Sequence, residues 1–224
     1  MPNPVAWDWS FAARTLPKIL GSLGTTLWVT VLSGVLAVAV GLVLTALAEA
    51  GSFVSRAGVR VLVELLRGCP LPIQLYFAFY GLPEYGIVWS GFTTGVVVLG
   101  LHYGAYVSEV FRGAIADVRR AHLLTCDALG LGIVARWRRI IVPLVFKFGT
   151  APVGSYMITI YKQTAYLFII GVPVIMSTAK LEGSKHFRYI EAYTIVGAIY
   201  LVVALSATAI VRRVECRGAS SFGT

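Results

Sequence analysis

The sequence is poor in charged residues, and this scarcity excludes some classes of protein. Only 13% of its 224 residues are charged, whereas 58% are hydrophobic and the mean hydropathy is +0.81. This composition excludes a disordered chain and disfavours a water-soluble globule. The formal charge of +9 could indicate nucleic acid, but long uncharged runs separate the basic residues, so a lipid bilayer is the better match.

Cysteine is also scarce, and its spacing argues against a disulfide framework or a zinc site. Cys69, Cys126 and Cys216 lie far apart, form no CxxC pair and are odd in number. They are interpreted as small packing residues. The sequence also lacks a Gly-Lys-Ser or Gly-Lys-Thr phosphate loop, so no cofactor and no ATPase site are expected in this chain.

Uncharged stretches long enough to cross a bilayer are abundant. A helix needs about 20 mostly apolar residues to cross a hydrocarbon layer roughly 30 Å thick. Three charge-free stretches meet this requirement, and two more do so with charged residues inside them. The sequence therefore predicts a single all-α membrane domain over 1–224, with spans at about 20–48, 58–82, 87–111, 146–171 and 191–212.

Basic residues indicate which side of the membrane each loop faces. Seven of them lie from Arg112 to Lys147, whereas the loop between Glu84 and Trp89 has none. Short loops rich in Lys and Arg tend to stay in the cytoplasm. We therefore expect the basic loop and the carboxyl terminus inside and the amino terminus outside, although the loop around 180–188 goes against the rule.

The basic loop is expected to contain a short helix of its own. Asp117 suits its amino-terminal cap and Gly130 suits its end. Leu123, Leu124, Ala128 and Leu129 recur near helical spacing and give the helix an apolar stripe. Either another protein covers this stripe, or the helix packs on its own bundle or lies in the lipid interface.

Five charged residues lie inside or at the ends of predicted spans: Glu64, Arg67, Glu109, Arg112 and Lys162. The first four form two pairs of opposite charge at a spacing of three, which places each pair on one helix face. A cation at the centre of a helix costs about 2.5–3.5 kcal/mol on insertion scales, so these residues should face the bundle. The predicted charge network either fixes the helices in register or changes partners as the bundle opens.

Polar and aromatic residues in the spans are candidates for a solute path. Aromatic faces attract cations, and an amide both donates and accepts hydrogen bonds, so a small zwitterion could be held there. Packing against lipid explains the same aromatics, and a lone histidine is more often a hydrogen-bonded interior residue than a ligand. The candidates are Gln74, Tyr80, His102, Tyr106 and Thr164.

Four segments, in order along the chain, match the motifs of one family. Arg67-Gly68-Cys69-Pro70 with Gln74 is similar to R-G-T-P-x-x-x-Q, and the run 105–113 is similar to A-Y-x-A-E-x-x-R-G. Gly130, nine residues, Ile140, Val142 and Pro143 resemble the end of E-A-A-x-x-x-G, nine residues, I-x-L-P, while 162–164 and 170–173 resemble K-D/E-T and I-G-V-P. Together they resemble the permease subunits of bacterial ATP-binding-cassette (ABC) importers for polar amino acids.

The resemblance implies a type I ABC importer permease fold with five transmembrane helices and a cytoplasmic coupling helix, here within 117–143. It also implies the bacterial cytoplasmic (inner) membrane, a second permease subunit, two ATPase subunits that bind ATP and Mg, and an extracytoplasmic solute-binding protein. The residues expected to couple to the ATPase are Leu123, Leu124, Thr125, Cys126, Asp127, Gly130, Ile140 and Pro143.

Two details separate this chain from the general pattern. Leu124-Thr125-Cys126 stands where the family has Glu-Ala-Ala, and Asp127 is the candidate for a partial replacement. The runs 7–9, 99–104 and 188–191 look most like permeases that import ectoine and hydroxyectoine. The expected function is ATP-driven import of a polar amino acid or ectoine-like solute by alternating access.

Two other functions remain as alternatives. An ion-gradient-driven secondary carrier of small polar solutes would use Lys162 and the acidic residues, but it usually shows inverted halves, which these five spans do not. A membrane enzyme would use His102, Glu109 or Cys126, but the spacing places no nucleophile beside a base. Association with an ATPase separates both alternatives from an importer.

Overall fold

The structure is a computed structural model that describes residues 7–50, 52–128 and 142–220. Every regular element among these residues is helical, as the composition predicts, and none is a strand. The α-helices are α1 (Trp9–Gly21), α2 (Leu23–Ala50), α3 (Phe53–Gly68), α4 (Leu71–Tyr76), α5 (Gly91–Ala128), α7 (Val142–Gln163), α8 (Ile175–His186) and α9 (Tyr189–Ser220). The segments η1 (Phe77–Gly81), η2 (Leu82–Tyr85) and η4 (Thr164–Ile170) are short π or 3-10 helices.

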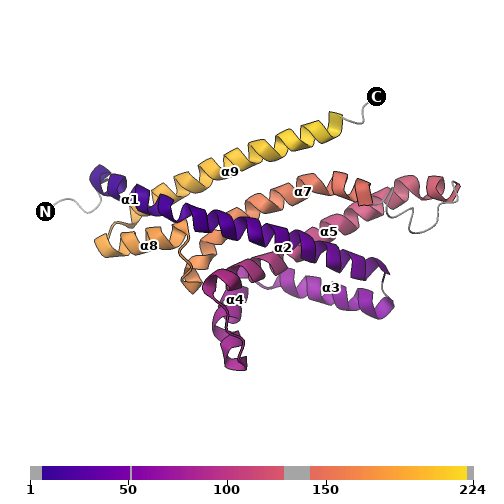
Figure 1. The fold of residues 1–224 in the computed structure, drawn as a ribbon, viewed down its shortest axis with the longest axis horizontal. Helices are drawn as coiled ribbons and strands as arrows, with labels where there is room; N and C mark the ends of the chain where they lie inside the picture. Colours follow the sequence, from indigo (N-terminus) through magenta and orange to yellow (C-terminus); the bar gives the residue numbers. More distant parts are fainter. Residues whose placement is uncertain (1–6, 51, 129–141, 221–224) are drawn as a thin grey trace.

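Helices α2 and α5 form the centre of the bundle, and glycines let them lie close together (Figure 1). A Cβ atom added to Gly100 would lie 2.6 Å from the Leu36 side chain, and one added to Gly104 would lie 2.6 Å from the Val40 side chain. Both distances are far below van der Waals contact. Small residues therefore set the spacing of these helices, as is common where lipid supplies no hydrophobic drive for helix association.

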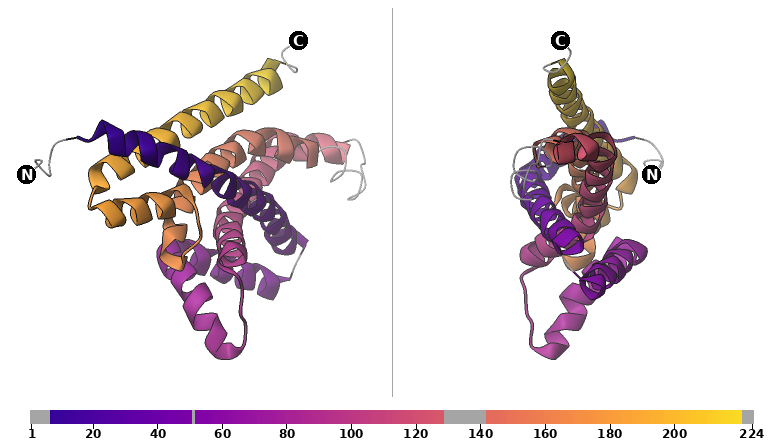
Figure 2. Two further views of the ribbon diagram at one scale, coloured as in Figure 1. Left: turned by 60° about the vertical axis from the view of Figure 1, so that its left-hand side comes forward. Right: turned by 90° about the vertical axis from the view of Figure 1, so that its right-hand side faces the viewer.

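The second predicted span, 58–82, is not one straight helix. Helix α3 and the segment Leu71–Tyr85 meet at an angle of 99°. The bend follows Pro70, which has no N–H to continue the hydrogen bonds of α3. Beyond the bend, η1 and η2 project from the bundle as an arm (Figure 2).

Helix α5 continues without a break through the start of the predicted cytoplasmic loop, so the prediction that a separate helix begins at Asp117 is wrong. The stretch of α5 from Gly91 to Asp117 has no proline, and each glycine inside a helix costs only about 1 kcal/mol relative to alanine. The 38 residues of α5 reach about 57 Å at 1.5 Å per residue. One rigid element thus runs from the third predicted span into the predicted coupling segment.

Helices α1 and α8 were not predicted, and they pack with the start of α9 at the amino-terminal end of the molecule (Figure 1). Two helical stretches of the described residues are long and apolar enough to cross a membrane, Trp9–Glu49 and Tyr189–Arg213. The number rises to four if each of two bent pairs of helices counts as one span. The count of five spans stays a prediction.

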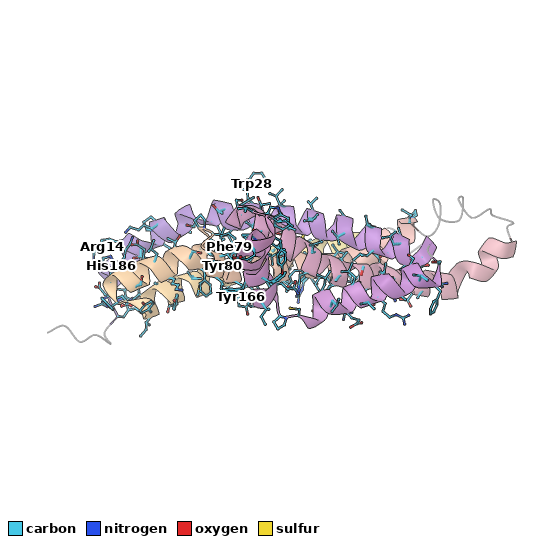
Figure 3. The ribbon with its side chains drawn as sticks, turned by 90° about the horizontal axis from the view of Figure 1, so that it is seen from below. Arg14, Trp28, Phe79, Tyr80, Tyr166 and His186 are labelled. Carbon is cyan, nitrogen blue, oxygen red and sulfur yellow. The ribbon has the colours of Figure 1, made fainter. Side chains whose placement is uncertain are left out.

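The outer surface of the bundle is strongly apolar. On α9, the side chains of Leu201, Val202, Leu205 and Ile210 are 58–62% exposed. On α2, Trp28 is 64% exposed and stands out from the bundle in Figure 3. Such a surface suits lipid or another membrane subunit, because water would not stabilise it.

Candidate functional site

Four aromatic side chains from α5 and α7 form a cluster beside the end of α3. The ring centroids of His102 and Tyr106 are 5.4 Å apart, and those of Tyr106 and Tyr156 are 5.6 Å apart. Tyr103 contacts all three of these rings, at 5.1–6.1 Å. From α3, the Arg67 guanidinium lies over the Tyr106 ring with its Cζ 5.0 Å from the centroid. We call these five residues the aromatic–arginine cluster.

The cluster is closed on one side and accessible on the other. His102 and Tyr103 are 7% and 4% exposed, whereas Tyr106 is half-buried and Arg67 is exposed. Arg67 forms no ion pair with another residue in the described part of the chain. A guanidinium binds a carboxylate in bidentate fashion, and tyrosine faces attract cationic groups. The cluster can therefore recognise both ends of a small zwitterion.

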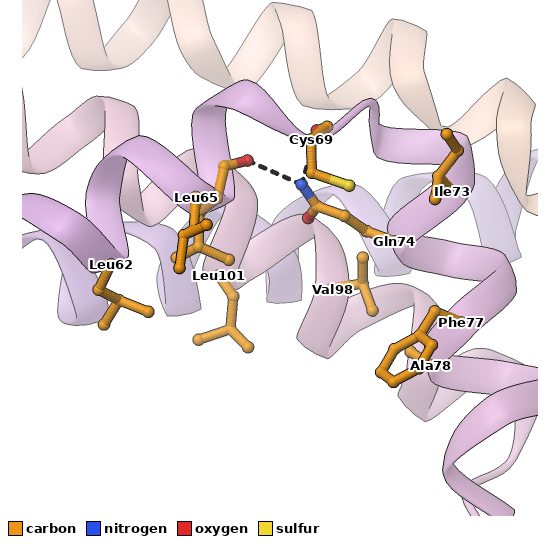
Figure 4. Close-up of a pocket in the computed structure, with 10 residues that line it drawn as sticks. Leu62, Leu65, Cys69, Ile73, Gln74, Phe77, Ala78, Val98 and Leu101 are labelled. Carbon is orange, nitrogen blue, oxygen red and sulfur yellow. Dashed lines mark hydrogen bonds between the residues drawn. The ribbon is translucent and has the colours of Figure 1, made fainter.

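Gln74 lies beside this cluster and makes three close contacts through its amide nitrogen. Nε2 is 2.7 Å from the Leu66 carbonyl oxygen and 2.8 Å from the Cys69 carbonyl oxygen (Figure 4). It is also 3.1 Å from Nδ1 of His102 on α5. Gln74 also lies at the edge of a groove of about 470 Å³ lined mainly by leucine, isoleucine, valine and phenylalanine side chains. A groove so apolar offers no partner for a charged solute.

The other two candidates for the solute path form their contacts elsewhere. Tyr80 lies on the projecting arm beside Phe79, and its hydroxyl donates to the Ile169 carbonyl oxygen at 3.4 Å (Figure 3). Thr164 is fully buried, and its hydroxyl donates to the Tyr161 carbonyl oxygen at 2.6 Å. The structure thus brings Gln74, His102 and Tyr106 together, but it does not bring Tyr80 or Thr164 into the cluster.

The five charged residues of the predicted network are only partly brought together. Arg112 and Glu109 form an ion pair of 2.8 Å on one face of α5. Glu64 and Lys162 are exposed, and neither forms an ion pair with another residue in 7–50, 52–128 or 142–220. A network that joins all five residues stays a prediction.

The predicted coupling residues fall on two helices and on the stretch between them. Residues 123–127 lie in the last turns of α5, and Pro143 lies exposed in the first turn of α7. Gly130 and Ile140 lie outside the described residues. The apolar stripe therefore belongs to the end of the helix that carries Tyr103 and Tyr106.

A second polar group lies where α1, α8 and α9 meet, and sequence reasoning missed it. Glu182 is 5% exposed, and its carboxylate lies 2.5 Å from Lys18 Nζ and 3.2 Å from Lys185 Nζ. Only the Glu182–Lys185 spacing of three could have pointed to it, because Lys18 is 164 residues away.

The same end holds a second ion group around Arg188. Its guanidinium lies 2.5 Å from Glu191 and 3.7 Å from Asp8, and the Asp8 N–H donates to Glu191 at 3.1 Å. The Asp8 carboxylate also caps α1, and hydrogen bonds from Ser10 and Phe11 hold its pKa below the usual value. We call the six charged residues of this end the end cluster: Asp8, Lys18, Glu182, Lys185, Arg188 and Glu191.

In the described part of the chain, no group of three His, Cys, Asp or Glu side chains could hold a metal ion. The polar groups that the structure does assemble are a cation over aromatic rings, an amide among carbonyl oxygens and paired charges at one end. Arrangements of these kinds can bind charged groups and can hold helices together.

Comparison with known proteins places these features in a family. Residues 37–217 match the model described as "Binding-protein-dependent transport system inner membrane component". A probable amino-acid ABC transporter permease protein of Sinorhizobium fredii is 34% identical over 206 residues, which cover 92% of this chain and 89% of that protein. The glutamine transport system permease protein of Escherichia coli is 29% identical, with 94% of this chain and 97% of that protein covered.

A solved structure shows the same arrangement of helices. A chain from the crystal structure of an amino acid ABC transporter with histidines matches with a TM-score of 0.90 and 27% identity. The match covers 95% of this chain and 100% of that chain.

Proposed function

The chain belongs to the inner membrane components of binding-protein-dependent transport systems, and on that premise we propose that it forms the membrane path for a small zwitterionic solute. It is a permease subunit of the amino-acid ABC importers, and the predicted permease fold is confirmed. The proposed solute is a polar amino acid or a compatible solute such as ectoine.

The aromatic–arginine cluster is the observation that supports this substrate class. A zwitterion presents a carboxylate and a cationic group a few ångströms apart. The exposed Arg67 guanidinium binds the carboxylate, while the faces of Tyr106 and Tyr156 attract the cation. The site lies against buried His102 and Tyr103, where a lower effective dielectric strengthens both attractions.

The proposed mechanism is alternating access driven by partner ATPases. The end of α5 at residues 123–128 docks into an ATPase subunit, which binds ATP and Mg and closes on its copy. Tyr106 lies twenty residues earlier on the same helix as Cys126, so about 30 Å of rigid helix joins the two places. Tilting α5 moves the aromatic side of the cluster relative to α3 and exposes the site to one side of the membrane at a time.

The proposal includes three partners and an orientation. A second permease subunit covers the apolar surface and the exposed charges Glu64 and Lys162, since unpaired charges inside a membrane are costly. A solute-binding protein delivers the substrate at the end formed by α1, α8 and α9. The amino terminus then lies outside, and the carboxyl terminus lies in the cytoplasm with the ATPases.

Uptake measurements on the reconstituted complex test the coupling step. With the ATPase and binding protein present, Gly130→Trp should allow ATP hydrolysis to continue while uptake falls at least about tenfold, because a bulky residue disturbs the docking segment. Unchanged uptake per ATP hydrolysed would count against this coupling. Uptake that follows a proton or sodium gradient without ATP would favour the secondary carrier instead.

Binding measurements on the partner solute-binding protein test the substrate. Tight binding of ectoine or hydroxyectoine supports the finer assignment. Tight binding of histidine, arginine or glutamine without ectoine binding rejects that assignment and leaves the importer function intact.

A further inference from the structure

The break between α3 and α4 leaves two backbone carbonyl groups without a helical partner. In a continuous helix, the Leu66 carbonyl would accept from the N–H of residue 70, but residue 70 is proline. The Cys69 carbonyl would accept from Ile73, whose N–H donates instead to the Pro70 carbonyl oxygen at 3.0 Å. A carbonyl left unpaired away from water is costly, so both need another donor.

One side chain supplies that donor to both carbonyls. Gln74 Nε2 lies 2.7 Å from the Leu66 oxygen and 2.8 Å from the Cys69 oxygen, while the Gln74 backbone N–H starts α4 by donating to Pro70 at 3.2 Å. Its backbone therefore belongs to α4, and its side chain closes the end of α3. Figure 4 shows the amide reaching back across the bend.

The same amide also joins the bend to α5. Nε2 lies 3.1 Å from His102 Nδ1, and an amide nitrogen only donates, so the ring nitrogen accepts. The amide has two hydrogens for these three acceptors, so two of the acceptors share one hydrogen. His102 in turn contacts Tyr103 and Tyr106, and Tyr106 lies under Arg67 at the end of α3.

We propose that Gln74 is a positioning residue that fixes the angle of the α3–α4 hinge and so holds Arg67 over Tyr106. It acts on the solute through Arg67 and touches no substrate itself, which replaces its predicted place in the solute path. This role deepens the proposed function, but the hinge geometry can be measured without any transport. Because Gln74 contacts both the bend and His102, a change in the hinge angle should also change the position of Arg67 relative to Tyr106.

Two substitutions at Gln74 separate hydrogen bonding from volume. Gln74→Met has a similar volume but no donor, and Gln74→Glu keeps the shape but presents only acceptors while it is ionised. A neutral glutamic acid regains one donor, so the Gln74→Glu defect should shrink as the pH falls from about 8 to about 5. Ile73→Met is the matched control, because Ile73 lines the same groove and its side chain makes no hydrogen bond across the bend.

The experiment measures the hinge directly in the assembled transporter. Spin labels replace Leu62 and Phe77, which are exposed on the two sides of the bend, and pulsed electron paramagnetic resonance gives the distance between them. We expect one narrow distribution for the parent and for Ile73→Met. In Gln74→Met, and in Gln74→Glu at the higher pH, we expect a second population with an opened hinge, about ten times more abundant than any such population in the parent.

Each outcome decides the proposal. It is supported if Gln74→Glu returns toward the parent distribution at the lower pH while Gln74→Met does not, with uptake per ATP following the same order. It is overturned if both variants keep the parent distribution or if the Gln74→Glu distribution ignores pH. It is also overturned if both variants fail to assemble at every pH while Ile73→Met assembles, since Gln74 would then serve folding alone. If the distance distributions change as expected but the parent complex shows no ATP-driven uptake, the role of Gln74 in the hinge stands and the proposed transport function is rejected.

Discussion

The end cluster and the α3–α4 hinge hold helices together by opposite means. At the end, Lys18 pairs with Glu182 across 164 residues of sequence, and the Asp8 N–H donates to the Glu191 carboxylate across 183 residues. At the hinge, a single neutral amide serves carbonyl groups within eight residues and one histidine of α5. Charged pairs suit the end because water reaches their cations, whereas a neutral donor suits a predicted span because burying a charge there costs more.

The comparison also distinguishes the end cluster, which fixes helices to one another, from the α3–α4 hinge, whose angle can change. The end cluster spreads its interactions over six side chains, so loss of one leaves the others in place. The hinge concentrates its interactions in one amide, so its angle depends on one side chain. A region with few local contacts is where a two-state change costs least.

The largest expected effect lies at the α2–α5 contact, on which the hinge depends through its contact with His102 of α5. Gly104→Leu would place a side chain where Val40 already lies 2.6 Å from the position of a Cβ, and overpacking of this kind costs about 1–3 kcal/mol or more. We expect almost complete loss of folded subunit on size-exclusion chromatography. Gly197→Leu is the control, because a Cβ there meets nothing within 4 Å. Equal yields for both variants would contradict the packing argument.

The second largest effect is expected at Arg67, the residue that the hinge is proposed to position. Arg67→Met removes the only cation of the aromatic–arginine cluster while it keeps much of the side chain's volume. Hydrogen bonds to a charged group contribute about 1.5–3 kcal/mol, so uptake at low substrate concentration should fall roughly 10- to 150-fold. Arg67→Lys should recover part of the loss. Normal transport by Arg67→Met, measured in proteoliposomes, would place the solute elsewhere.

A smaller effect is expected from a substitution in the end cluster. Glu182→Gln removes the charge that both Lys18 and Lys185 contact, and the side chains of these lysines are 56% and 54% exposed. Pairs of this kind contribute about 0.2–1 kcal/mol each, so thermal unfolding in detergent should begin a few degrees lower with transport unchanged. Loss of uptake at full stability would mean that the end cluster moves during transport.

The smallest effect is a response to acid at Asp8. The Ser10 hydroxyl, the Phe11 N–H and Arg188 hold the pKa of this carboxyl below its ordinary value of 3.8. Its contribution to the docking of α1 is therefore complete above that value and is lost as the pH falls through the lower, folded-state pKa. Hydrogen exchange of α1 should accelerate only below about pH 4, and Asp8→Asn should remove this pH dependence. Equal acid responses in the parent and in Asp8→Asn would exclude Asp8 as the cause.

Much of the helical architecture was predictable because it depends on composition over long windows. The charge-free stretches before Glu49 and after Glu191 coincide with α2 and α9. The hinge was predictable only in part. The sequence contains Pro70, which can break a helix, but the apolar length of 58–82 favoured one continuous span. The helix start predicted at Asp117 failed because a good capping residue starts a helix only where the chain is not already helical.

The sequence named Gln74, His102 and Tyr106, which the structure brings together, while their roles in a solute path stay predictions. His102 is a hydrogen-bonded interior residue, as the sequence suggested, and Tyr106 lies beside it. Gln74 was assigned to the solute path, yet its amide is engaged with the Leu66 and Cys69 carbonyl oxygens. No local pattern shows which acceptors a side chain will meet when they lie across a bend.

The sequence alone determined that the chain is a helical membrane protein and which family it resembles, because hydropathy and motifs are properties of the chain read in order. Only the tertiary structure decided the 99° hinge, the partners of Gln74 and the ion pairs of the end cluster. Those features depend on distances between residues that are far apart in the chain or separated by a bend. Such distances follow from the packing of α2 against α5 and of α1 against α8 and α9, which no local spacing encodes.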